Sequence, residues 1–173
     1  QAGGGGRIMK ETMDNLVQSL REELIQYGEM LTLLEDQQEL IVNRSADGLI
    51  QNLTAIHSQM AEIAKVRDKR DEQRFELANS LEKDGDILFK ELIPCMPSDY
   101  QTLTQALLDE VNGLLQKANQ RMRQNHLLLS RSLDFMQQLI QSLFPTQAGQ
   151  TYDQSGQIGA GYIPQRTTYE TLI

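Results

Sequence analysis

The sequence of 173 residues is about one domain long and carries a formal net charge of −8. A chain this acidic lacks a broad positive surface for a polyphosphate, and its one dense basic stretch, residues 65–74, is interleaved with acids, so nucleic acid is excluded as the main partner. Aromatic residues make up only 5% of the chain and tryptophan is absent, a composition typical of long helices that fill their seams with Leu, Ile and Met.

The first predicted element is a helix from Lys10 to Asn43. Glycine-rich residues 1–8 precede it, and we predict that they form a flexible leader or a remnant of cloning, with Met9 as the native start. The apolar residues of the helix lie alternately four and three positions apart, which places them along one side of a helix about 50 Å long. They are Met13, Val17, Leu20, Leu24, Tyr27, Leu31, Leu34 and Ile41, with Gln38 as an interruption.

A second helix follows a short break at residues 43–48, with Ser45 as its N-cap because a hydroxyl oxygen there can accept from a backbone N–H. So short a connection between two long helices predicts an antiparallel hairpin. Within residues 65–74 the apolar stripe gives way to charges, and we expect this stretch to project past its neighbours or to face water. The predicted stripe is Leu49, Leu53, Ile56, Met60, Ile63, Leu77 and Leu81.

Residues 84–98 are less regular, with a short helix around Ile87 to Ile93 that Pro94 and Pro97 close. Ser98 or Asp99 then caps the longest predicted helix, about residues 99–144, which Pro145 ends. The fold class is therefore all-α: an antiparallel hairpin of long helices plus a third long helix, a three-helix bundle or coiled coil over residues 9–145. Along the third helix a heptad seam recurs every seven positions, at Leu108, Leu115, Met122, Leu129, Met136 and Leu143.

The tail, residues 146–173, is rich in Gly, Gln and Thr and has no helical stripe. It holds too little apolar surface to offset the entropy of ordering, so we predict that it is disordered when free. Three of the chain's five tyrosines lie in it, Tyr152, Tyr162 and Tyr169, a pattern typical of short linear binding segments.

The sequence does not indicate a catalytic site or a metal-binding site. His57 and His126 lie in different helices, and neither belongs to the Glu-x-x-His pair that a di-iron bundle needs. Cys95 has no second cysteine with which to bind a metal or form a disulfide, and we expect it to be a buried loop thiol. No run of 18 apolar residues and no secretory signal is present. The sequence predicts a cytoplasmic, non-enzymatic protein without a cofactor and without membrane insertion.

Two polar residues, Asn125 and Ser132, interrupt an apolar line of the longest helix, and two interpretations stay open. In the first, Asn125 is buried and fixes the register of the helix at some cost in stability. In the second, this part of the helix is offered to a partner, because its Met and Leu content suits an adaptable face that binds helices. Periodicity alone favours the core for the apolar residues around them.

The same helix resembles the long third helix of FlgN-type flagellar export chaperones over residues 115–135, where an Asn is followed by a Leu pair and then by Ser-Leu. The helix ending at residues 33–41, the turn after it and the helix leading to residues 70–74 are also similar to that family. Residues 151–157 resemble the family's tail motif, a Tyr followed closely by Gly. The resemblance covers most of residues 9–157, whereas residues 158–173 have no counterpart.

The resemblance implies a cytoplasmic chaperone of the type III export system that assembles the flagellum. Its clients would be the terminal helical regions of the hook-filament junction proteins FlgK and FlgL, and Tyr152 would dock on the cytoplasmic domain of the export gate protein FlhA. The alternative is a structural coiled coil that homo-oligomerises, and a homodimer stays open. The client-binding residues implied are Asn125, Leu128, Leu129, Ser132, Phe135, Met136, Leu139, Ile140 and Leu143.

Overall fold

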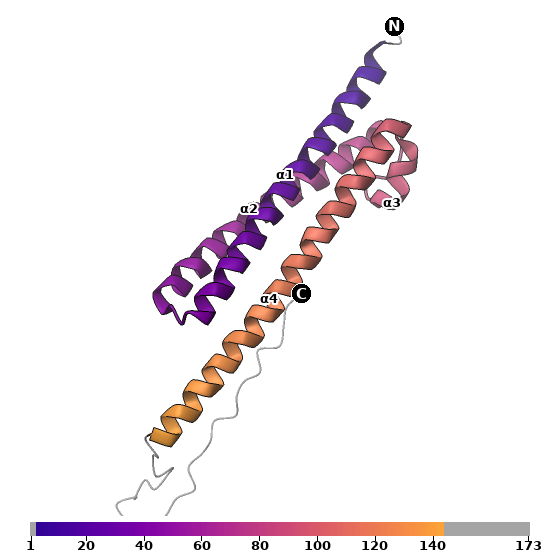
Figure 1. The fold of residues 1–173 in the computed structure, drawn as a ribbon. Helices are drawn as coiled ribbons and strands as arrows, with labels where there is room; N and C mark the ends of the chain where they lie inside the picture. Colours follow the sequence, from indigo (N-terminus) through magenta and orange to yellow (C-terminus); the bar gives the residue numbers. More distant parts are fainter. Residues whose placement is uncertain (1–2, 144–173) are drawn as a thin grey trace, which may run out of the picture. The chain divides into compact units, whose positions relative to one another are not determined.

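The computed structural model describes residues 3–143, in which the regular structure is entirely helical (Figure 1). This confirms the all-α fold class. The predicted disorder of residues 146–173 and the roles of their tyrosines lie outside the described residues. The chain divides into two units, residues 1–130 and residues 131–173. The helices are α1 (Gly3–Val42), α2 (Ala46–Ser80), α3 (Phe89–Leu92), the 3-10 turn η1 (Ile93–Cys95) and α4 (Ser98–Leu143).

Helix α1 begins earlier than the sequence predicts. It starts at Gly3, so that most of the stretch assigned to a flexible leader is helical. A helix that already exists extends by one hydrogen bond for each residue added, which can offset the poor helix propensity of glycine. At Gly5 and Gly6 an added Cβ would meet no neighbour within 4 Å, so α1 is not packed against another element at these two residues.

Each helix of the hairpin is followed, two positions after its last residue, by a residue in the left-handed conformation. Arg44 has φ 55°, and the N–H of Ser45 donates to the carbonyl oxygen of Leu40 at 3.0 Å. Glu82 also has φ 55°, with the N–H of Lys83 donating to Ala78 at 2.9 Å. These are Schellman motifs, in which glycine is usual because it has no Cβ. Neither end carries a glycine here, which is why sequence inspection did not single them out.

Helices α1 and α2 run antiparallel, side by side (Figure 1). Two buried amides of α2 fix their register: Asn52 Nδ2 donates to the carbonyl of Leu33, and Gln59 Nε2 donates to that of Gln26, each at 2.9 Å. The two donors are seven residues apart, and so are their acceptors in the opposite direction. Ser45 is the N-cap of α2 as predicted, although its hydroxyl makes no capping hydrogen bond.

The predicted apolar stripe of α2 is therefore wrong in part. Leu53 and Met60 are exposed, whereas Asn52 and Gln59, one position before each, are buried. The polar residues face α1 because its backbone carbonyl oxygens accept their amide hydrogens, which removes the penalty of burial without a partner. Hydrophobic periodicity counts only apolar residues and misses this arrangement.

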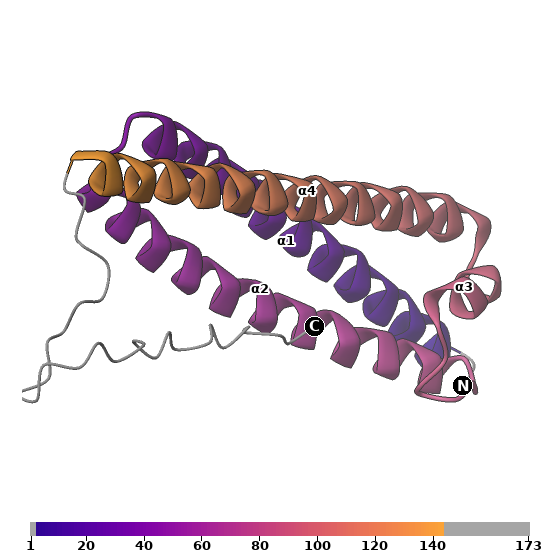
Figure 2. The same ribbon diagram turned by 90° about the horizontal axis from the view of Figure 1, so that it is seen from below.

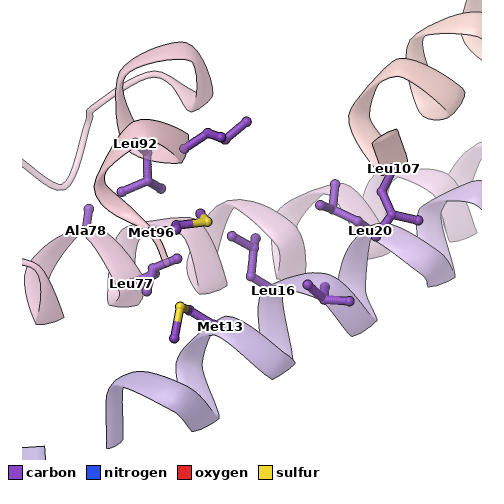
Figure 3. Packing of buried hydrophobic residues seen from close by; sticks show 10 residues of the cluster. Met13, Leu16, Leu20, Leu77, Ala78, Leu92, Met96 and Leu107 are labelled. Atoms are coloured by element: carbon purple, nitrogen blue, oxygen red, sulfur yellow. The ribbon is translucent and has the colours of Figure 1, made fainter. Parts of the chain in front are cut away.

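The main apolar cluster joins all parts of the first unit at one end of the hairpin (Figure 3). Because α3 and η1 contribute to it, the short irregular segment is held beside the end where α1 begins and α2 ends (Figure 2). The predicted short helix is confirmed as α3, which begins at Phe89, but Pro94 does not close it, because Pro94 lies inside η1. The buried residues are Met13, Leu16, Val17 and Leu20 of α1, Leu77 and Ala78 of α2, Leu92, Ile93 and Met96 of the connection, and Leu107 of α4.

Helix α4 lies along α1 and runs parallel to it in the first unit. Tyr100 donates to Asp14 at 2.6 Å near the start of α4, and Asn125 donates to Gln37 at 3.0 Å further along both helices. The same offset places Val42, the last residue of α1, level with about Ser130. Between these contacts lies a second apolar cluster, made of Tyr27, Met30, Leu34, Ile63, Val111 and Ala118.

Candidate protein-binding surface

Helix α4 carries two apolar lines, and the more regular one is exposed. Val111, Ala118 and Asn125 are buried against the hairpin. The strict heptad line beside them is not: from Leu115 through Leu129 its residues are at least 37% exposed. Because α1 packs on the first line, the second has no helix over it in the first unit. Periodicity alone favoured the core for the apolar residues around Asn125 and Ser132, and for Met122 and Leu129 this prediction is wrong.

The end of α4, residues 131–143, is named here the distal segment. Its apolar side chains are between 40% and 68% exposed: Leu133, Phe135, Met136, Leu139, Ile140 and Leu143. At 3.6 residues per turn they cover an arc about 160° wide, and Asp134, Gln137 and Gln141 lie on the opposite side. A contiguous exposed apolar face of this kind marks a site of protein interaction.

The structure distributes the residues predicted to bind a client between core and surface. Leu129 and five residues of the distal segment are exposed, namely Phe135, Met136, Leu139, Ile140 and Leu143. Leu128 and Ser132 are half-buried. Asn125 is only 2% exposed, which takes it out of the exposed surface. Leu133 was missed, although it lies four residues after Leu129 and three before Met136, on the same helical face.

The interpretation of Asn125 as a buried residue that fixes register is the one that the structure supports. Its Nδ2 donates to the backbone carbonyl of Leu34 at 2.7 Å and to Oε1 of Gln37 at 3.0 Å. Its Oδ1 is buried without a hydrogen-bond partner, a defect that costs about 1–3 kcal/mol. One turn earlier, Arg121 donates to Gln38 and lies 3.8 Å from Glu35.

The charged stretch at residues 65–74 is not simply a solvated face, as the sequence suggested. Arg70 Nη1 donates to both carboxylate oxygens of Glu23, each at 3.1 Å, and its guanidinium lies 5.9 Å from the ring centre of Phe89. Arg74 donates to the backbone carbonyls of Gly85 and Ile87. The two arginines therefore bind the connection after α2 to the hairpin.

Burial raises the pKa of Glu23 above its ordinary value, although the nearby guanidinium of Arg70 acts in the opposite direction. Burial also raises the pKa of Tyr27, and the charge of Glu23 adds to that effect. The pKa of Tyr100 is raised by its hydrogen bond to Asp14. These groups belong to the packing of the helices.

Among residues 3–143 no cluster of His, Cys, Asp and Glu side chains is placed to hold a metal ion. His57 and His126 are exposed, as expected of helix surface residues. Cys95 is exposed as well, which corrects the prediction of a buried thiol, because η1 turns its side chain outward and only the carbonyl of Glu91 accepts from it, at 3.5 Å. No helix in this part of the chain has the length and apolar character that a bilayer crossing requires.

Comparison with known protein families gives a match over most of the chain. The sequence model of the FlgN protein family matches residues 9–159. This range takes in the hairpin, the connection and α4, and it extends through Tyr152. Searches of the curated proteins and of the solved structures found no match.

Proposed function

Because the chain belongs to the FlgN family of flagellar export chaperones, we propose that it holds the terminal helical regions of hook-filament junction proteins similar to FlgK and FlgL. The distal segment provides the holding surface. The chaperone acts in the cytoplasm, without nucleotide or metal, and passes its client to the type III export gate. Binding keeps the client's apolar helices from assembling before export.

The observation that carries this proposal is the exposed apolar face of the distal segment. An amphipathic helix of the client can lay its own apolar stripe on Leu133, Met136 and Ile140, which follow one another at helical spacing. Methionine at the centre of such a face adapts to different partners. On the opposite side of the helix, Gln137 and Gln141 face the solvent.

The test is binding of a purified terminal helical fragment of the FlgK-like protein from the same organism, measured by calorimetry. Ile140→Asp places a charge in the apolar face and should weaken binding at least about tenfold, since desolvating a carboxylate at an interface is costly. Gln141→Asp is the matched control, with the same new charge on the opposite face. Equal affinity of the two variants would overturn the holding surface.

We propose in addition that Tyr152 docks on the FlhA-like gate protein. The match of the family model through residue 159 supports this assignment. Tyr152→Ala should leave binding of the client fragment unchanged and weaken binding to the purified cytoplasmic domain of the gate protein. Tyr162→Ala serves as the control. Loss of client and gate binding together, or of neither, would contradict this division between helix and tail.

The exposed heptad line of α4 suits a second function, homo-oligomerisation through a coiled coil. The heptad spacing of Leu115, Met122 and Leu129, all exposed, favours this alternative. Mass in solution distinguishes the two functions. A stable oligomer whose mass does not change when the client fragment is added would support self-assembly. Replacement of the oligomer by a complex with the fragment would support the chaperone.

A further inference from the structure

Two buried asparagines in the bundle share the same unusual arrangement. Asn52 of α2 and Asn125 of α4 each donate to a backbone carbonyl of α1, at 2.9 Å and 2.7 Å. Each also leaves its Oδ1 buried without a hydrogen-bond partner. A leucine would remove this defect at either position, because the accepting carbonyls belong to helix backbone that has its own donors.

The surroundings of Asn125 differ from those of Asn52 in one respect. The contact of α1 with α4 is apolar as far as Leu34 and Ala118. Beyond that point polar contacts join the two helices: Arg121 contacts Gln38 and Glu35, and Asn125 contacts Gln37. Hydrogen bonds of this kind exchange readily for bonds to water, so this end of the interface separates more easily than the apolar part.

We propose that Arg121 and Asn125 form a latch, which a client helix opens as it binds. Residues 119–130 of α4 then separate from α1, and the end of α1 becomes a second surface for the client within the first unit. It contributes Leu34, which is 1% exposed in the closed form. The occupant is the amphipathic terminal helix of the client, so this inference rests on the proposed function and adds a second surface to it.

If the latch exists, a substitution that stabilises the closed form should lower the affinity for the client fragment, and one that destabilises it should raise that affinity. Asn125→Leu removes the unsatisfied oxygen and makes the interface apolar, which stabilises the closed form. It should raise the midpoint of thermal unfolding. Because binding must first open the closed form, the same variant should bind the FlgK-like terminal fragment about tenfold more weakly, equal to about 1.4 kcal/mol.

Asn52→Leu is the matched control. It makes the same change at an asparagine with the same defect, on the side of α1 that faces α2. It should raise the unfolding midpoint while leaving the affinity for the fragment unchanged. Arg121→Ala should have the opposite effects, because it removes the contacts to Gln38 and Glu35 that hold the latch closed. The protein should unfold at lower temperature and bind the fragment about two- to fivefold more tightly.

The outcomes separate this inference from the proposed function. Unchanged affinity of both Asn125→Leu and Arg121→Ala, with normal binding by the wild type, would overturn the latch and leave the holding surface in place. Equal weakening by Asn125→Leu and Asn52→Leu would also overturn it, because the effect would then follow overall rigidity. Failure of the wild type to bind the fragment would overturn both. Circular dichroism checks the helical content of each variant, and if Asn125→Leu did not fold, Arg121→Ala would carry the test.

Discussion

Arg70 and Glu23 lie 47 positions apart in the sequence, yet the guanidinium of one donates to both carboxylate oxygens of the other at 3.1 Å. The Glu23 side chain is only 1% exposed and that of Arg70 is 16% exposed. A charge so deeply buried is tolerated because its partner is present. This pair also connects the hairpin with Phe89 of α3, over whose ring Arg70 lies.

Replacing Arg70 by Ala should destabilise the protein by about 3–5 kcal/mol, because the Glu23 carboxylate would remain buried without its partner. Urea denaturation at neutral pH measures the change. Lys69→Ala is the control: Lys69 pairs with Glu22 at 2.9 Å on the surface, and its loss should cost no more than about 1 kcal/mol. Similar losses in the two variants would contradict the structural role of Arg70.

The raised pKa of Glu23 gives its contribution a defined pH dependence. Because the folded protein holds this proton more tightly than the unfolded chain does, the stability that Glu23 provides is full below its ordinary pKa of 4.5 and is lost as the pH rises through the raised value. The wild type should therefore lose stability relative to Glu23→Gln between pH 4 and pH 7. Urea midpoints of both proteins across this range, on the order of six pH values, test the sign. If the free energy of unfolding of the wild type rose relative to that of Glu23→Gln as the pH increased, the direction of the pKa shift would be contradicted.

Glu82 occupies a left-handed position that glycine adopts without strain. Glu82→Gly should stabilise the protein by about 0.5–1 kcal/mol, the relief of steric strain exceeding the added flexibility of the unfolded chain. Lys83→Gly, one position later and outside the left-handed region, should destabilise the protein or leave it unchanged. Thermal unfolding of the two variants gives the comparison. If Lys83→Gly stabilised the protein as much as Glu82→Gly, relief of strain at the left-handed position would not explain the effect.

Leu77 and Met60 belong to the same predicted stripe of α2 but differ in burial. Leu77 is fully buried in the main apolar cluster, whereas Met60 is 54% exposed. Leu77→Ala should cost about 2–5 kcal/mol because it leaves a cavity, and Met60→Ala should stay within about 0.5 kcal/mol. Chemical denaturation of both variants tests this difference. A large loss of stability in Met60→Ala would instead indicate that Met60 is buried, as the predicted stripe requires.

The sequence alone was sufficient for the three long helices, apart from the start of α1, and for the family. Spacings of three and four, the break before Ser45, and Pro97 just before α4 indicate where the long helices lie, because these signals act through local backbone geometry. The Asn-Leu-Leu element and the order of the helices were enough for the resemblance that the family match now confirms.

Only the tertiary structure decided which of the apolar lines is buried. Val111 and Ala118 face α1, while the more regular line through Leu115 and Met122 stays exposed. A heptad repeat says that a helix has an apolar face, but burial depends on where the neighbouring helices pack. The sequence likewise marked Asn125 as exceptional, yet its partner, the carbonyl of Leu34, lies 91 positions away and became visible only when α4 was placed along α1.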